Sequence, residues 1–440
     1  MFQTLRNAFK IEDLRKKLIY TFLMLIVIRA GSVLPVPGAN ISEFQAYLDQ
    51  IRETAEGAFG LFSAMTGGSF ENLAVFALSI TPYITSSIIM QLLTIAIPRL
   101  EELQKDGEEG RKKIAELTRY VTVALALIQS IAMAIGFSRS GYIDSGILNI
   151  IICVVTFTAG SAVLMWIGEQ ITEKGVGNGI SIVLVINILS RVPSDLVDLY
   201  KQFIEGKKIA NAILAAAIIL AVIFITIVLV IILQDGVRKI PVQYSKKIQG
   251  RKTVGGQSSH IPLKVNTAGV IPVIFASSLL SFPVVIANLI GKTPQKGFWA
   301  GVFKGLSSSN WCNPNNWVYS IGLIVYVLLC VFFAYFYTSI TFNPLEIADN
   351  MKKQGGFIPG IRPGKPTADY LTKILNYIIF IGAIGLIIIC VIPIFFNGIF
   401  GASVSFGGTS IIIIVSVVLE TIKQIESQML VRNYKGFLKN

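Results

Sequence analysis

The chain has 440 residues, of which 53% are hydrophobic and only 14% are charged, and its formal net charge is +13. A soluble globular protein carries about 25% charged residues. This composition excludes a soluble globule, a disordered chain and a collagen-like fibre, and four cysteines are too few for a disulfide scaffold. The sequence therefore predicts an integral membrane protein.

Ten apolar stretches are long enough to be membrane spans, since a helix needs about 20 apolar residues to cross a bilayer. Arg29 is the only charged residue inside any of them. The predicted fold class is therefore an all-α polytopic membrane protein with ten transmembrane helices. The stretches cover residues 18–34, 73–97, 121–137, 147–167, 176–190, 209–233, 265–290, 317–341, 374–396 and 404–419.

Basic residues are distributed unevenly between the two sides of the membrane. One set of alternate segments holds 28 of the 38 Lys and Arg residues and has a net charge of +12, whereas the other set is neutral. Because basic loops stay in the cytosol, both termini are predicted to be cytosolic. The basic set comprises residues 1–17, 98–120, 168–178, 234–264, 342–373 and 420–440.

Counting five spans to each half divides the chain into residues 18–190 and 209–419, joined by an external hinge loop at 191–208. Residues 1–17 are predicted to form an amphipathic helix at the membrane surface, and 420–440 a cytosolic tail. Pro82 and Pro272 each interrupt the second span of a half, as an inverted repeat would have them. Proline is common in membrane helices, so chance is the alternative.

The stretch 57–70 is apolar and rich in glycine but too short to cross the membrane. It could be a re-entrant segment, whose backbone must then be satisfied by protein or by a water cavity. An amphipathic turn on the outer surface is the alternative, and the residues alone favour neither.

Candidate catalytic and metal-binding groups are missing from the spans. Cys153, Cys330 and Cys390 lie within spans and Cys312 lies alone in an external loop, with no metal-ligand or disulfide spacing. Arg29 lies near the end of its span, where snorkelling to the interface is expected. We predict no enzymatic activity, no metal and no cofactor. The main alternative is an inverted-repeat small-molecule transporter, although such proteins need polar groups at mid-membrane.

Two cytosolic loops carry clustered basic residues. Topology and attraction to anionic lipid would explain them, and a docking surface for an acidic partner or RNA is the second interpretation. Prolines and glycines around Arg362 indicate a shaped loop. The basic residues of loop 234–264 are Arg238, Lys239, Lys246, Lys247, Arg251 and Lys252.

Several blocks, in the same order along nearly the whole chain, resemble the SecY family of protein-translocation channels. They include Leu-Pro-Val-Pro-Gly, Phe-Ala-Leu-Ser-Ile-Thr-Pro-Tyr-Ile, Trp-Ile-Gly-Glu-Gln-Ile-Thr-Glu-Lys-Gly, Gly-Asn-Gly-Ile-Ser-Ile and Phe-Gly-Gly-Thr-Ser, which begin at residues 34, 76, 166, 177 and 406. The resemblance implies a channel that passes unfolded secretory proteins across the cytoplasmic membrane and releases apolar segments sideways into lipid. It also favours the re-entrant interpretation of 57–70.

The resemblance also implies roles for individual residues. The pore ring would comprise Ile80, Ile84, Ile180, Leu184, Ile274 and Ile413, with Leu184 standing where other members often have isoleucine. The plug, at about 57–72, would include Phe62, Ser63, Met65, Gly67 and Gly68. Polar candidates at the lateral gate, between spans two and three and spans seven and eight, are Thr85, Gln129, Ser277 and Ser278.

Partners are likewise implied by the resemblance. SecE, and SecG beside it, would be the membrane subunits, and the SecA ATPase or the ribosome would supply the driving force. Secretory preproteins with their signal peptides would be the cargo. Arg362 and the basic residues of loop 234–264 would receive the motor and the ribosome.

Overall fold

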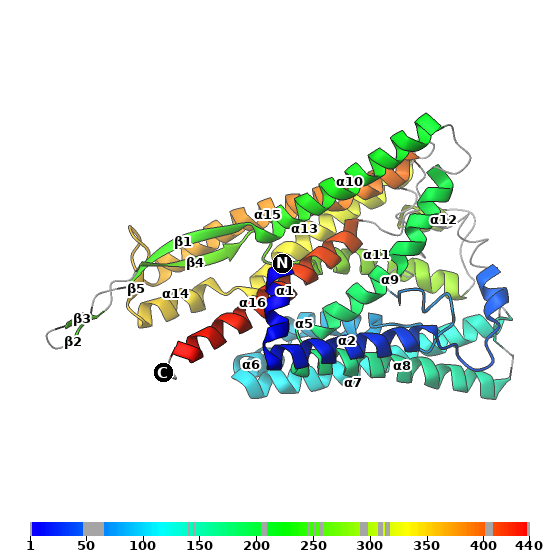
Figure 1. Cartoon of the computed structure of the whole chain (residues 1–440), viewed down its shortest axis with the longest axis horizontal. Coiled ribbons are helices and arrows are strands. Elements are labelled where there is room, and N and C mark those ends of the chain that lie inside the picture. Colours follow the sequence, from blue (N-terminus) through cyan, green and yellow to red (C-terminus); the bar gives the residue numbers. More distant parts are fainter. Residues whose placement is uncertain are drawn as a thin grey trace.

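The computed structural model gives the chain as a bundle of helices, most of them long and running roughly along its longest axis (Figure 1). It describes residues 2–46, 66–139, 141–143, 146–203, 209–244, 247–249, 252–254, 258–290, 298–306, 311–312, 317–400 and 408–437. Phe62, Ser63, Met65, Lys246 and Arg251 lie outside the described residues, and of Lys247 and Lys252 only the strand backbone is described.

Helices of the first part of the chain lie together on one side of the molecule, and helices of the second part on the other (Figure 1). The first group is α1 (Phe2–Lys10), α2 (Glu12–Val33), α5 (Thr81–Ala96), α6 (Pro98–Lys105), α7 (Gly107–Arg139), α8 (Ile147–Lys174) and α9 (Gly179–Phe203). The second group is α10 (Ile209–Asp235), α11 (Ile271–Ile290), α12 (Phe298–Leu306), the 3-10 helix η2 (Trp317–Ser320), α13 (Ile321–Thr341), α14 (Pro344–Lys353), α15 (Lys365–Phe400) and α16 (Gly408–Phe437).

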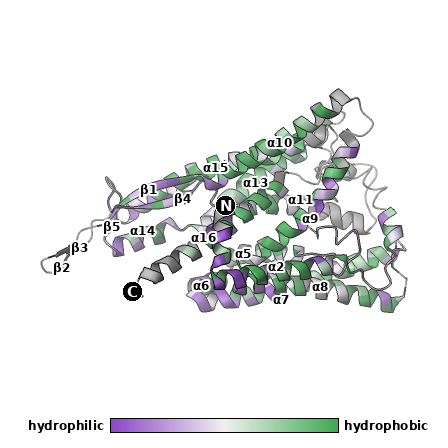
Figure 2. Cartoon of the chain, in the orientation of Figure 1, coloured by the Kyte–Doolittle hydropathy of each residue, from purple (hydrophilic) through white to green (hydrophobic). Residues whose placement is uncertain are grey.

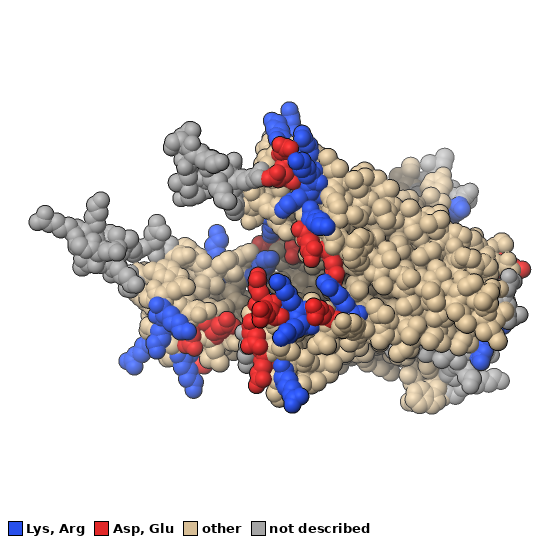
Figure 3. Space-filling model, turned by 90° about the horizontal axis from the view of Figure 1, so that it is seen from below, with Lys and Arg blue, Asp and Glu red and all other residues tan. Residues whose placement is uncertain are grey.

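Six of the described helical segments are long and apolar enough to cross a membrane, and the bent pair α5 and α6 adds a seventh if it counts as one span. The other predicted spans coincide with α2, α11 and α16. Hydrophobic residues cover the middle of the bundle, and hydrophilic residues gather toward the end that carries α6 and α14 (Figure 2). In the space-filling view, a broad uncharged belt separates this charged end from the opposite one (Figure 3).

The second predicted span differs from a plain helix, because residues 66–80 are turns and α5 begins only at Thr81. Pro82 is the second residue of α5, and Pro272 is likewise the second residue of α11. A proline has no N–H to donate, and a helix has no acceptor for the first N–H groups, so proline fits there without loss. The paired prolines therefore mark the starts of two helices rather than kinks inside them.

The turns before α5 are held by the segment that follows α2. The Val36 N–H donates to the Leu73 carbonyl and the Val75 N–H donates to the Leu34 carbonyl, both at 2.9 Å. Next to this pairing, five aromatic rings pack edge to face in a buried cluster. Their residues are Phe44, Phe70, Phe137, Tyr142 and Phe157.

The two basic loops join in a small sheet, which the sequence analysis did not anticipate. Strands β1 (Val237–Tyr244) and β4 (Ser258–Lys264) pair antiparallel, and β5 (Gly356–Phe357) adds to β1 from the other loop. Beyond them, β2 (Lys247–Gln249) and β3 (Lys252–Val254) form a separate hairpin. The predicted all-α class therefore describes the membrane part, while the loops form a compact β unit.

Candidate functional site

All six residues assigned to the pore ring meet in one apolar cluster, here called the central cluster. Ile80, Leu184 and Ile413 are buried in it, and the other three pack against it partly exposed. They come from four separate helices and the turn before α5. The fold therefore brings together residues that lie far apart in the sequence. The six are Ile80, Ile84, Ile180, Leu184, Ile274 and Ile413.

Several of these side chains lie in the first turns of their helices. Ile84 and Ile274 lie in the first turns of α5 and α11, two residues after the proline of each helix. At the start of α9, the Asn178 carboxamide oxygen accepts from the N–H groups of Ile180 and Ser181, at 3.1 and 3.4 Å, and so caps the helix. Leu184 lies one turn further along and therefore faces the same side as Ile180.

The position of Ile80 is held by polar contacts behind it. The Asn187 side-chain amide of α9 donates to the Ser79 hydroxyl at 3.0 Å, and the Ser161 hydroxyl of α8 donates to the Ser79 carbonyl at 3.3 Å. Ser79 has a left-handed backbone, with a φ of 52°, which only such support makes tolerable for a residue other than glycine.

Chemically, the central cluster is suited to sealing rather than to binding. Branched aliphatic side chains form no hydrogen bonds, and an apolar constriction excludes water and ions by dewetting. A passing peptide would meet no fixed polar partner there. A small-molecule transporter would instead need polar or charged groups at this depth.

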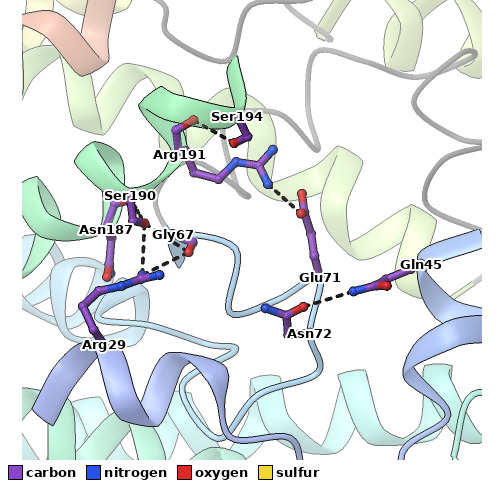
Figure 4. A network of polar contacts seen from close by, with 9 residues as sticks. All are labelled: Arg29, Gln45, Gly67, Glu71, Asn72, Asn187, Ser190, Arg191 and Ser194. Atoms are coloured by element: carbon purple, nitrogen blue, oxygen red, sulfur yellow. Dashed lines mark hydrogen bonds and ion pairs between the residues drawn. The ribbon is translucent and has the colours of Figure 1, made fainter. Parts of the chain in front are cut away.

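A polar network lies around the described end of the plug stretch (Figure 4). The Gly67 carbonyl accepts from the Arg29 guanidinium and from the Ser190 hydroxyl, each at 3.2 Å. Arg29 also donates to the Ser190 hydroxyl at 3.0 Å. Nearby, Arg191 pairs with Glu71 at 2.6 Å, and both side chains are mostly buried.

This network corrects the expectation that Arg29 snorkels. Its guanidinium bonds within the protein, to α9 and to the chain at Gly67, instead of extending to solvent. Glu71, Ser190 and Arg191 were not predicted as site residues, because Glu71 and Arg191 lie just outside apolar runs and Ser190 is an ordinary polar residue at the end of one. The one available signal was that Arg29 is the only charge within a predicted span.

Gly67 needs to be a glycine for two independent reasons. Its φ is 64°, and an added Cβ would lie 2.8 Å from the Asn187 Cα. Gly68 has a φ of 82°, and an added Cβ would meet only the Arg191 Cδ, at 4.0 Å. The two predicted plug glycines therefore allow the chain to turn and to lie directly against α9.

The four polar residues predicted for the lateral gate are not joined to one another by hydrogen bonds in the described part of the chain. The hydroxyls of Thr85 and Ser277 donate to carbonyls of their own helices, at Thr81 and Val273. Gln129 and Ser278 are half-buried. The two sides are in contact: α7 lies against α11, and Ile88 of α5 packs against the apolar cluster formed around α11, α13 and α15.

Arg362 lies in a loop whose neighbours are firmly held while its own side chain is exposed. Ile358 is buried against β1 and α15, and the Thr367 hydroxyl donates to the Arg362 carbonyl at 2.8 Å. The guanidinium itself makes no hydrogen bond or ion pair with any described residue. Arg238 and Lys239 are exposed on β1 of the adjoining sheet.

No group of three His, Cys, Asp or Glu side chains within the described ranges could hold a metal ion. All four cysteines are free and buried. Outside the spans, burial raises the pKa of the Cys312 thiol, which lowers its reactivity as a thiolate at neutral pH.

Comparison with known proteins covers the whole chain. A family model described as SecY matches residues 74–422. Over 447 residues the chain is 44% identical to protein translocase subunit SecY of Halalkalibacterium halodurans, and over 449 residues it is 43% identical to that of Bacillus subtilis, with 100% of both chains covered in each case. The subunit of the same name in Streptomyces coelicolor is 45% identical over 453 residues, again with full coverage of both chains.

Solved structures share the fold. One described as a protein conducting channel matches with a TM-score of 0.64 at 18% identity, covering 94% of this chain and 92% of that chain. Another, from work on the plug domain of the SecY protein, matches with a TM-score of 0.63 at 18% identity and the same coverage.

Proposed function

This chain belongs to the SecY family, and from that membership we propose how its own residues carry a polypeptide through a membrane. The chain is a protein-conducting channel of the protein translocase and is not an enzyme. The rival interpretation, a small-molecule transporter, is less favoured because the described side chains of the central cluster are mainly aliphatic and offer a substrate few polar partners there.

The central cluster is the constriction of the proposed path. One observation carries this proposal: six branched aliphatic residues, distant in sequence, converge at the starts of helices from both halves of the chain. At rest they seal the membrane against ions, and an unfolded chain parts them without breaking hydrogen bonds. Residues 57–72, including the predicted Phe62, Ser63, Met65, Gly67 and Gly68, are the proposed plug.

A cytosolic partner supplies the energy in this proposal, because the sequence holds no nucleotide-binding loop. The SecA motor or the ribosome docks on the sheet of β1, β4 and β5 and on the Arg362 loop, where exposed basic side chains face outward. SecE and SecG are the proposed membrane subunits, and secretory preproteins and their signal peptides the cargo. The channel is placed in the cytoplasmic membrane with both termini cytosolic, and its basic loops also lie against anionic lipid.

Disulfide crosslinking at Ile274 tests the proposed path. With the four native cysteines replaced, a cysteine at Ile274 is expected to crosslink to a cysteine in a secretory precursor stalled midway. The adduct should require the motor and ATP, because only then does the precursor reach the central cluster. Adduct formation is measured by mobility shift on non-reducing gels.

Leu279, which is exposed on the far side of α11, provides the matched control position. A cysteine there should crosslink much less with the same stalled precursor. If no precursor position crosslinks to Ile274 while export stays intact, the polypeptide passes elsewhere and the transporter interpretation returns.

The lateral gate is proposed to open between α5 and α7 on one side and α11 and α13 on the other. Gln129→Leu is expected to lower export of weak-signal precursors about threefold to fourfold. Gln129 is half-buried without a hydrogen bond to any described residue, and a leucine there buries more apolar surface in the seam, which stabilises the closed gate by about 0.8 kcal/mol. Export of a strong-signal precursor in the same cells serves as the control. Equal export of weak-signal precursors by Gln129→Leu and by the unchanged protein removes Gln129 from the gate.

A further inference from the structure

Two arginines bond to one short stretch of chain, residues 66–71 (Figure 4). Arg29 reaches the Gly67 carbonyl from α2, and Arg191 reaches the Glu71 carboxylate from α9. Ser190 is the third participant and directly precedes Arg191, so both contacts tie the stretch to the same turn of α9.

The contacts at Gly67 are close and mutually dependent. Its carbonyl accepts from both Arg29 and Ser190, and the Ser190 hydroxyl also lies 2.7 Å from the Asn187 carbonyl. An added Cβ at Gly67 would lie 2.8 Å from the Asn187 Cα, so the chain here is pressed against α9. Moving Gly67 away from α2 and α9 breaks its hydrogen bonds with Arg29 and with Ser190 together.

The charge of Arg29 is energetically unfavourable at its position inside an apolar span. A cation within an apolar span is unfavourable unless polar groups surround it, and such residues are functional by default. No carboxylate among the described residues pairs with Arg29, so its charge is met by the Gly67 carbonyl and the Ser190 hydroxyl. Loss of these acceptors would leave the guanidinium poorly solvated, which favours the arrangement in the structure.

The ion pair between Arg191 and Glu71 is well shielded from solvent. The exposed fractions of the two side chains are 13% and 19%. Charge-assisted hydrogen bonds of this kind are about twice as strong as neutral ones, and salt screens buried pairs weakly. Between the two anchors, Phe70 is buried in the aromatic cluster against Phe44.

We propose that Arg29, Ser190, Arg191 and Glu71 form a latch that holds the end of the plug against α9 in the resting channel. This proposal rests on the assignment of residues 57–72 as the plug. The latch sets how readily the channel opens, because the stretch cannot move away from α2 and α9 without breaking its contacts with both arginines. Arg29 and Arg191 are thus positioning residues for a seal made by other groups.

Resting ion leak through the full-length protein in proteoliposomes, without motor or precursor, tests the latch. Arg29→Met and Glu71→Gln are each expected to raise the leak about tenfold, as expected when a charged hydrogen bond of the closed state is lost. Arg29→Lys keeps the charge and should leak less than Arg29→Met. Arg139→Met, at an exposed arginine ending α7, should leave the leak unchanged.

Exchanging the charges separates a latch from a merely structural role. Glu71→Arg and Arg191→Glu should each leak, whereas the double exchange restores an ion pair and should return the leak to within about threefold of the original protein. A double exchange that leaks as much as the single variants overturns the role of this pair. If Arg29→Met fails to accumulate in membranes, Ser190→Ala tests the same anchor.

Deleting residues 62–68 distinguishes failure of the latch from failure of the plug assignment. If the deletion leaks but neither Arg29→Met nor Glu71→Gln does, the latch is overturned while the assignment of residues 57–72 as the plug stands. No leak from the deletion removes the plug assignment, and the latch with it. Leak from the deletion and from both latch variants, with recovery in the double exchange, supports the proposal.

Discussion

Replacing Ile84 and Ile274 together with asparagine is expected to make the resting channel leak ions at least about tenfold faster. Both side chains pack against the central cluster from the first turns of α5 and α11. An amide in this constriction binds water, and burying it without a partner costs about 1–3 kcal/mol, so the dry closed state is weakened. Ion flux in proteoliposomes without precursor measures the effect.

The matched control places the same two amides on the same two helices but away from the cluster. Ile95 on α5 and Leu279 on α11 are 49% and 55% exposed, and their double asparagine variant should keep the resting leak low. An equal leak from both double variants would mean that general weakening of the helices is responsible, and the six-residue ring would lose its support.

Reversing the charge of Arg362 is expected to lower motor-driven transport at least about tenfold. The side chain is exposed without a partner among the described residues, while Ile358 and Thr367 hold the loop beneath it. Arg362→Glu should therefore leave the loop in place and act on docking, where loss of a desolvated charged contact costs about 2–5 kcal/mol. ATP-dependent uptake of a precursor into membrane vesicles measures the rate.

Lys353→Glu supplies the matched control, because Lys353 is also exposed and ends α14 within the same cytosolic loop. Its transport rate should stay near that of the unchanged protein. The amount of each variant in the membrane should equal that of the unchanged protein, since docking is not needed for the chain to insert. Normal ATP-dependent rates for Arg362→Glu would remove this residue from the docking surface.

Much of the architecture could be predicted from apolar runs and the distribution of charge. Each of the ten predicted spans overlaps a described helix, although only the later part of span 73–97 is helical, because about 20 apolar residues have few stable alternatives in a bilayer. The ring residues are a different case. In the sequence, an isoleucine of the ring such as Ile274 looks the same as one that faces lipid. Only the family resemblance pointed to the six ring residues, which the structure places in one cluster.

The sequence by itself determined the membrane class, the spans and the basic loops, because these depend on local composition. Only the tertiary structure decided that Arg29 bonds to Gly67 and Ser190, and that β5 joins the two basic loops into one sheet. Such pairings join residues that lie far apart in the chain. Their partners are selected by how the helices pack, and no local pattern of charge or hydropathy records that choice.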